Sequence, residues 1–325
     1  MDSVPPTPDL LSDPLLPSIA RQGQARQVLT LPWMRKRVRL GTCFRSDLFH
    51  TDTPFSTTPL FTSPITGTYL PSSSPSSFRT SDTTTATTTT SHLSTSLGVS
   101  AGCPLLHASA TSHYDRAALH NTAACKTSTA TTLRAGTITL ATPPRLTDAA
   151  ILILKHGGGL PALRHRCGDY YVAALVLGAS AAALASRAAA TESVAERVAV
   201  VARLCALFWS NGPTEERAWG AASGAAAVAV EACSTLGEER VSEAASGVEE
   251  VERLAGRVRG VLAGVEEVPA RVEGVLGALG VRAGGVVSGE VCDALCDQGL
   301  VVELVLVPVE TLWEVRLGET GAGVV

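Results

Sequence analysis

The sequence has few of the residues on which nucleic-acid-binding proteins depend. Aromatic residues make up only 4% of its 325 residues, and only three lysines are present. Nucleic-acid binding usually requires a basic patch with interleaved aromatic side chains, and no segment has this pattern. We therefore expect no nucleic-acid partner. Apolar residues reach 45%, mainly through Ala, Val and Leu, so the chain can bury a sizeable core made of small side chains.

The cysteines lack the spacing of a metal site or a disulfide framework. The eight stand at Cys43, Cys103, Cys125, Cys167, Cys205, Cys233, Cys292 and Cys296. No two form a CxxC pair, and although Cys292 and Cys296 are one helical turn apart, a zinc site would need two more ligands. We expect buried free thiols, no metal and no cofactor.

The sequence also lacks a recognisable catalytic constellation. The glycines at 157–159 are not followed by the Lys-Ser or Lys-Thr of a phosphate-binding loop. Glu215 and Glu216 are adjacent, so they point to different faces and do not suit paired acid and base chemistry. We predict that the chain is not an enzyme, has no catalytic residue and takes no small-molecule substrate.

Charge and hydropathy bear on partners and on location. All 19 glutamates lie in residues 171–325, which indicates either an acidic face for a basic partner or glutamates that simply accompany helices. The N-terminus lacks the pattern of a signal peptide, and the apolar run 170–186 is shorter than the ~20 residues of a spanning helix. We expect a cytoplasmic protein, with association to a membrane surface left open.

Residues 1–93 form a low-complexity region that we expect to be largely disordered. Prolines recur through it, and residues 83–91 are nearly all Thr. Such segments cannot bury enough apolar surface to offset the loss of chain entropy. Short extended pieces at 28–31 and 38–44 are expected to dock on the later domain. The basic run 35–39 suits nuclear import, a contact with acidic lipid, or a solvated loop.

Residues 94–325 have the pattern of an α+β domain. Strands are predicted at 96–107, 125–140 and 300–307, and short helices at 148–156 and 290–297, capped by Thr147 and Ser288. The apolar runs 170–185 and 198–209 suit either helix or strand, and the second is more typical of a buried strand.

The clearest predicted helix spans residues 241–268. Its apolar residues alternate spacings of three and four: Val241, Ala244, Val248, Val251, Ala255, Val258, Leu262 and Val265. This acidic helix either docks a partner, as in a coiled coil, or lies on its own sheet. The interior glycines favour the second arrangement, since each costs about 1 kcal/mol relative to Ala.

The most distinctive segment contains Cys167, Gly168, Asp169, Tyr170 and Tyr171, followed after six residues by Gly178 and Ala179. It resembles the signature of the membrane-attack-complex/perforin (MACPF) superfamily: aromatic, Gly, Thr or Ser, His, aromatic, six residues, Gly-Gly. Gly168, Tyr171 and Gly178 match this signature at its spacing. Cys167 replaces the first aromatic residue, Asp169-Tyr170 replaces Thr-His, and Ala179 replaces the second glycine.

This resemblance implies a divergent MACPF-like domain, of fungal type, over residues 94–325. Its fold would be a bent antiparallel sheet of about four strands flanked by helices, with a long C-terminal helical region. The signature and hinge residues would be Gly168, Asp169, Tyr170, Tyr171, Gly178 and Ala179, with glycine relieving the bend.

The resemblance also implies a module that binds a membrane or a protein and forms a homo-oligomer. Family pore formers carry two inserts, each of which becomes a hairpin whose arms need about 9–11 residues. We place these inserts at 107–125 and 186–196, which are too short for a competent pore. The alternative is a non-enzymatic structural or interaction protein that docks a partner through helix 241–268. The Ala-Gly-Val-Arg bias also leaves open a drifted reading frame with no stable fold.

Overall fold

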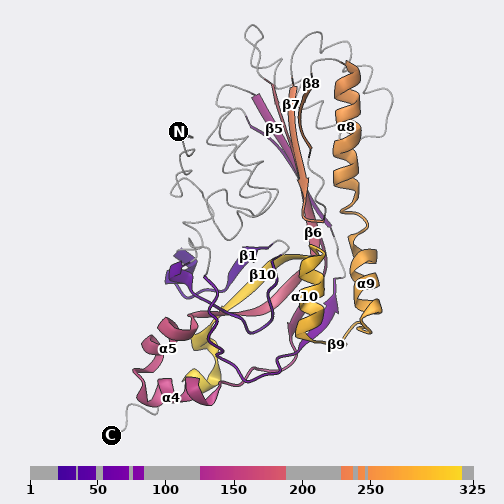
Figure 1. The fold of residues 1–325 in the computed structure, drawn as a ribbon. Coiled ribbons are helices and arrows are strands. Elements are labelled where there is room, and N and C mark those ends of the chain that lie inside the picture. Colours follow the sequence, from indigo (N-terminus) through magenta and orange to yellow (C-terminus); the bar gives the residue numbers. More distant parts are fainter. Residues whose placement is uncertain are drawn as a thin grey trace, which may run out of the picture.

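One strongly bent, antiparallel sheet organises the protein (Figure 1). The computed structural model describes residues 21–33, 36–48, 54–72, 76–83, 125–187, 228–236, 241–245 and 248–316. Within these residues the sheet has ten strands: β1 Leu29–Pro32, β2 Cys43–Phe44, β3 Gly67–Pro71, β4 Ser76–Thr83, β5 Cys125–Leu140, β6 Tyr170–Arg187, β7 Val228–Ser234, β8 Val241–Ala245, β9 Val286–Val287 and β10 Val301–Pro308.

Two long strands, β5 and β6, run through the whole sheet and pair with each other over most of their length. β5 is rich in Thr, which suits a strand because its β-branched side chain packs well on a pleated surface. β6 is rich in Ala, a residue that favours helix in isolation. Residues 170–185, which suit either helix or strand, form a strand because β5 pairs with one edge of β6 while β10 and β7 pair with the other.

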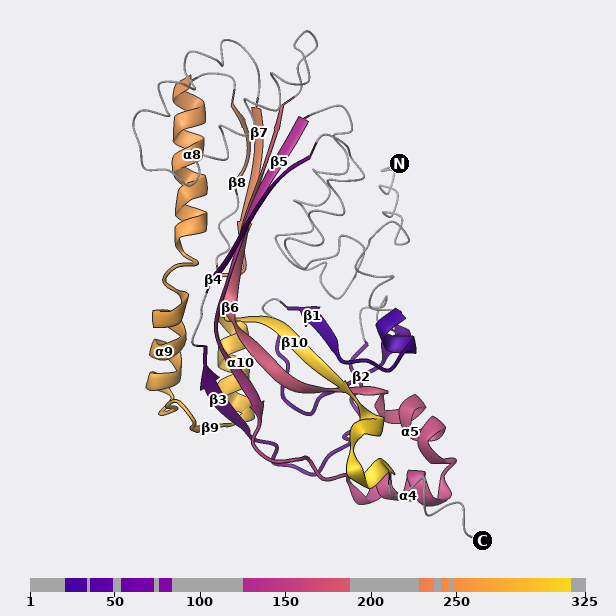
Figure 2. The same cartoon turned by 180° about the vertical axis from the view of Figure 1, so that it is seen from behind.

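β5 and β6 each change their outer neighbour part-way along their length, at the same height in the sheet. In the lower half of the sheet β5 pairs with β3, and β6 pairs with β10. In the upper half β5 pairs with β4, β6 pairs with β7, and β8 covers the far side of β7. The sheet turns sharply between the two halves (Figures 1 and 2).

The helices cover the sheet and its lower end. They are α4 Asp148–His156, α5 Gly159–Cys167, α8 Val248–Ala263, α9 Val268–Ala278 and α10 Gly289–Asp297, with two 3-10 turns, η2 Ser46–Leu48 and η3 Val309–Thr311. α8 lies along β7 and β8, and α9 lies beside the lower parts of β5 and β6 (Figures 1 and 2). α4 is capped as predicted, because the Thr147 side chain accepts a hydrogen bond from the Ala150 N–H.

The predicted helix 241–268 is wrong at its start and at its end. Residues 241–245 form the edge strand β8, since β7 offers a free edge with which they pair in register, and the helix begins only at Val248. α8 ends at Ala263, before Pro269. Strand β10 follows α9 and α10, so the C-terminal part of the domain is not one long helical region.

The face of α8 that packs inward confirms that the helix lies on its own sheet. Leu254, Val258 and Val261 are buried in the main core. On the outer side, Arg257 pairs with Glu243 of β8. The apolar face that a coiled-coil partner would need is therefore already used inside the protein.

Part of the predicted low-complexity region belongs to the sheet. β1 pairs with β10, and β2 pairs with β6, which confirms the docking of the extended pieces at 28–31 and 38–44. β3 and β4 also come from this region and pair with β5. The division into 1–93 and 94–325 stays a prediction for the remaining residues.

Two predicted strands, 96–107 and 198–209, lie outside the described residues. The predicted short helix at 290–297 and strand at 300–307 are confirmed as α10 and β10, with Ser288 at the N-cap of α10. Across the described ranges, no helix is long and apolar enough to cross a membrane.

Candidate functional site

The signature residues occupy two places on one strand. Gly168 to Tyr171 form the junction between α5 and the start of β6, and Gly178 with Ala179 lie further along β6 at the bend of the sheet. These two places are the candidate functional site.

Gly168 ends α5 in a conformation that favours glycine. Its φ is 121°, and a Cβ there would lie 2.7 Å from the carbonyl oxygen of Phe44. Its N–H donates to the Arg164 carbonyl at 2.9 Å, as a helix C-cap does. Only a residue without a side chain allows the α5 end to approach β2 this closely.

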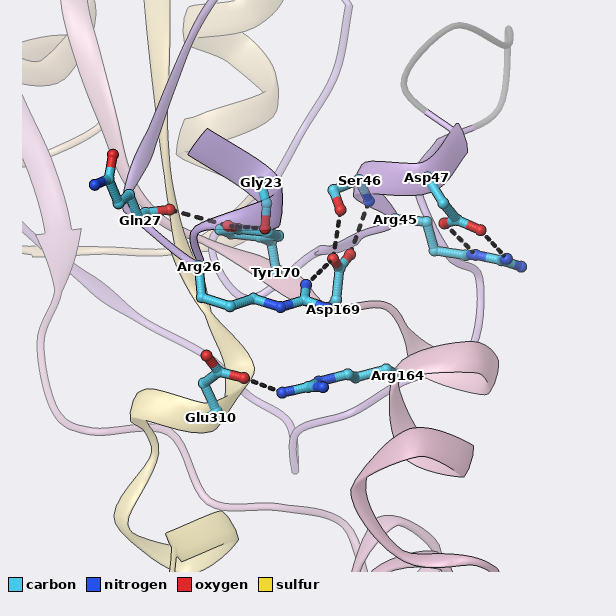
Figure 3. A network of polar contacts seen from close by, with 10 residues as sticks. All are labelled: Gly23, Arg26, Gln27, Arg45, Ser46, Asp47, Arg164, Asp169, Tyr170 and Glu310. Carbon is cyan, nitrogen blue, oxygen red and sulfur yellow. Dashed lines mark hydrogen bonds and ion pairs between the residues drawn. The ribbon is translucent and has the colours of Figure 1, made fainter. Parts of the chain in front are cut away.

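Asp169 joins two distant segments of the chain to the start of β6 (Figure 3). Its carboxylate accepts hydrogen bonds from the Ser46 N–H at 2.7 Å, the Ser46 hydroxyl at 2.5 Å and the Arg26 guanidinium at 2.5 Å. The carboxylate is largely buried, so these charge-assisted bonds replace the water that it lost on folding. Asp169 thus holds the segment before β1 and the η2 turn against β6.

The two tyrosines extend this junction in opposite directions. The Tyr170 hydroxyl donates to the Gln27 carbonyl at 3.0 Å, and burial raises its pKa to about 12 (Figure 3). Tyr171 packs edge-on against Phe61, with ring centroids 5.2 Å apart. Burial also raises the pKa of Tyr171, and a hydrogen bond with the Thr311 side chain partly opposes this.

A second ion pair lies below this network. Arg164 of α5 pairs with Glu310 of η3 (Figure 3). Since η3 directly follows β10, the pair fixes the end of α5 to the end of β10. Sequence reasoning identified Asp169 and Tyr170 but missed their partners Arg26, Ser46 and Gln27, because nothing local marks pairings across such long separations.

Gly178 is the point at which the sheet bends. A Cβ at this position would lie only 2.0 Å from the Leu133 carbonyl oxygen of β5. The register of β5 shifts between Arg134 and Gly136, opposite Gly178, as at a β-bulge. Bulges bend a strand and increase its twist, so the missing side chain and the bulge together allow the bend.

The exchange of partners also occurs at this level. The Gly178 N–H donates to the Leu300 carbonyl at 2.8 Å, where pairing with β10 ends. Ser180 exchanges hydrogen bonds with Thr235, just after β7: its N–H donates to the Thr235 hydroxyl, and its carbonyl accepts from the Thr235 N–H. Ala179, between them, is fully buried.

No family model matches the sequence, and no curated protein matches it. Among solved structures, the chain is similar to one described as a trapped toxin, with 14% identity and a TM-score of 0.45 over 88% of this chain and 60% of that chain. It is also similar to a non-hemolytic pneumolysin from Streptococcus pneumoniae strain ST306, with 11% identity and a TM-score of 0.41 over 70% of this chain and 56% of that chain. A third similar structure is stonustoxin, with 10% identity and a TM-score of 0.37 over 90% of this chain and 34% of that chain.

The bent antiparallel sheet with its flanking helices (Figure 1) agrees with the architecture that the resemblance to the signature implies. The likenesses concern the fold alone, and the chain spans less than two thirds of each of these three structures. The expectation that the chain is not an enzyme stays a prediction. The roles of the six signature residues stay predictions, as does the fungal type.

Four cysteines are buried free thiols, as predicted: Cys43, Cys167, Cys292 and Cys296. Burial raises the pKa of Cys43 and of Cys296 to about 12, which keeps both protonated and unreactive. Within the part of the chain that the structure describes, no group of three or more His, Cys, Asp and Glu could hold a metal ion.

Two arginines of the basic run 35–39 have partners. Arg37 pairs with Asp297 at 2.7 Å, and Arg39 pairs with Asp293 at 2.5 Å, so this segment is fastened to α10. The chain also contains a Gly-x-Ser-x-Gly spacing, at residues 98–102. It matches a nucleophile elbow in spacing only, because that motif requires a strand–turn–helix context and these residues lie outside the described ranges.

Proposed function

We propose that the chain is a membrane-acting module of MACPF type, in which two connections of the sheet supply the membrane-inserting arms. One observation carries this proposal: the two long connections leave the same end of four adjacent strands. β4, β5, β6 and β7 pair in that order, residues 84–124 join β4 to β5, and residues 188–227 join β6 to β7.

These boundaries correct the predicted inserts. Residues 107–125 and 186–196 were assigned as inserts because the Ala-rich run was expected to end near Ser186 and a second strand was expected at 198–209. Instead, β7 begins at Val228. Each connection is roughly 40 residues long, enough for two arms of about 9–11 residues and a turn. Insert length therefore gives no argument against a pore.

The strand ends also suit continuation into hairpins. Thr83 of β4 lies opposite Lys126 of β5, and Arg187 of β6 lies opposite Val228 of β7. Each connection therefore leaves and re-enters the sheet at neighbouring paired positions. Residues of the connections can therefore extend the existing antiparallel pairs in the same register, without a change in strand order.

The charges of the two connections differ. Residues 84–124 contain only two charged residues, Asp115 and Arg116, whereas 188–227 contain seven. Charge on a lipid-facing position costs about 2–4 kcal/mol near the bilayer midplane. The second connection therefore limits pore formation more than the first, and membrane binding with weak release is the expected activity.

Dye release and vesicle flotation with the purified full chain test this proposal. Phosphatidylcholine vesicles, alone and with anionic lipid or sterol, would be loaded with a self-quenching dye. We expect the protein to float with at least one vesicle type and to release dye from it. A variant in which 94–114 are replaced by a Gly-Ser linker should still bind but release less. The matched control replaces residues 1–20, which belong to neither connection, by a Gly-Ser linker and should release dye as the parent does.

The outcome of these assays distinguishes a lytic module, a non-lytic membrane-binding module and a protein that does not bind membranes. Binding without release by the parent would identify a non-lytic membrane-binding module. Absence of flotation with every vesicle type would refute the proposal and leave the non-enzymatic interaction protein. A homo-oligomer is part of the proposal, so cross-linking should yield higher species on vesicles. No specific observation favours docking through the acidic helix.

A further inference from the structure

Two adjoining hollows share Trp313 in their linings, near the end of the described chain. Their volumes are about 510 and 440 Å³, within the usual range of small-ligand sites, about 300–1,000 Å³. Trp313 lines both hollows and is 57% exposed. This yellow part of the chain lies beside α4, at the opposite end of the molecule from the upper ends of β5, β6 and β7 (Figures 1 and 2).

The walls of the hollows are fastened to one another. They come from the segments 62–66, 140–145 and 311–313 and from Tyr171 of β6. The Thr62 N–H donates to the Arg145 carbonyl at 2.9 Å, and the Ala141 N–H donates to the Thr66 carbonyl at 3.0 Å. Glu314, next to Trp313, accepts from the Leu146 N–H at 2.7 Å. A site held in this way is formed before its ligand arrives, so binding loses little ordering entropy.

The lining is rich in hydroxyl groups and poor in charge. Thr62 and Thr66 line the first hollow, Thr311 and Tyr171 line the second, and Thr142 lines both. Among the described residues, Arg145 is the only charged one that lines either hollow. A phosphate or sulfate site would ordinarily hold several cations or a bidentate arginine clamp, and a lipid-tail site would lack the hydroxyls.

An exposed indole among hydroxyls suits a ligand that has both apolar and polar sides. The face of an indole ring carries partial negative charge and attracts weakly positive C–H groups. A pyranose ring presents C–H groups on one face and hydroxyls around its edge. Those hydroxyls can donate to and accept from threonine side chains.

We infer that the two hollows form a binding site for a neutral saccharide, with Trp313 as the stacking platform. The hollows adjoin, because Thr142, Pro143, Pro144 and Trp313 line both, and one sugar unit occupies each hollow. The preferred ligand is therefore an oligosaccharide of at least two units. This inference is independent of the proposed membrane activity.

A glycan array followed by calorimetry tests the site with the full chain and without lipid. The array carries neutral, sialylated and sulfated oligosaccharides, and we expect neutral ones to bind. The best neutral oligosaccharide would then be titrated into variants. Trp313→Ala should weaken binding at least tenfold, Trp313→Phe about threefold, and Thr142→Val about threefold.

The controls address folding and charge. Leu152→Ala removes another exposed apolar side chain, on α4 and outside both hollows, and should leave the affinity within twofold. Arg145→Gln should also leave it within twofold. Circular dichroism of Trp313→Ala and Trp313→Phe should match the parent, because an exposed side chain contributes little to the core.

Three results would overturn the inference. One is an array on which no neutral oligosaccharide binds. A second is equal affinity in the parent and Trp313→Ala. The third is a preference for sulfated or sialylated glycans that Arg145→Gln abolishes, which would assign the hollows to an anion instead.

Discussion

Substitution of Gly178 by Ala tests whether the bend of the sheet depends on a missing side chain. The new Cβ would lie 2.0 Å from the Leu133 carbonyl oxygen and 3.1 Å from the Arg134 Cα. Both atoms belong to the backbone of β5, so no side chain can rotate away and the two central strands must separate locally. We expect the free energy of unfolding to fall and the bend to be the first place that loses its pairing.

The size of the effect follows from two opposing contributions. Overfilling a packed site costs typically about 1–3 kcal/mol, and a clash with backbone belongs at the upper end of that range. Replacement of Gly by Ala also restricts the unfolded chain, which stabilises the fold by about 0.4–1 kcal/mol. The expected net loss is about 2 kcal/mol.

Urea unfolding followed by far-UV circular dichroism measures this loss. The matched control is Gly256→Ala on α8, where a new Cβ meets nothing within 4 Å. Removal of a glycine from a helix interior should raise the free energy of unfolding by up to about 1 kcal/mol. The reasoning fails if Gly178→Ala is as stable as the parent, or if the two variants change in the same direction by similar amounts.

The remaining predictions concern the Asp169 network and the buried thiols. Asp169→Asn should lower the free energy of unfolding by about 2 kcal/mol, because it weakens charge-assisted bonds to Ser46 and Arg26. The control Asp47→Asn, at an exposed pair with Arg45, should lower it by less than about 0.5 kcal/mol. Equal losses for the two variants in urea titrations would contradict the importance of the Asp169 network. Burial raises the pKa of Cys43 to about 12 from an ordinary value near 8.5–9, so the unfolded chain loses this proton first and stability should decline between about pH 9 and 12. Cys43→Ala should make that decline shallower when unfolding is compared at pH 8 and 10.5, and an unchanged slope would count against it. Iodoacetamide at pH 8 should label Cys43, Cys167, Cys292 and Cys296 only after denaturation, which peptide mapping can establish.

Features that depend on neighbouring residues could be predicted from the sequence. Thr147 and Ser288 mark helix starts because an N-cap needs only the next turn of the chain. The glycine spacing of the signature predicted Gly178 as a hinge, because a close approach between two backbones requires a residue without a side chain. The Thr-rich strand β5 was also predicted, with its bounds.

Features that depend on distant pairing were missed. Residues 241–245 fit a helical spacing, yet they form β8 because β7 provides an edge for them. The Ala-rich residues 170–187 fit a helix as well, and β5, β10 and β7 made them the longest strand of the sheet. The predicted inserts were bounded by strands expected at 96–107 and 198–209, whereas the neighbours that pair with β5 and β6 are β4 and β7.

The sequence by itself determined the Thr147 cap, the burial of four thiols and the resemblance to the MACPF signature. Each of these features depends on residues a few positions apart in the sequence, between which steric contacts and local hydrogen bonds act directly. Only the tertiary structure decided the partners of Asp169, the identity of β8, the length of the two connections and the hollows around Trp313. Those depend on which strands lie side by side, and the free energy of such pairing comes from segments that the local sequence does not specify.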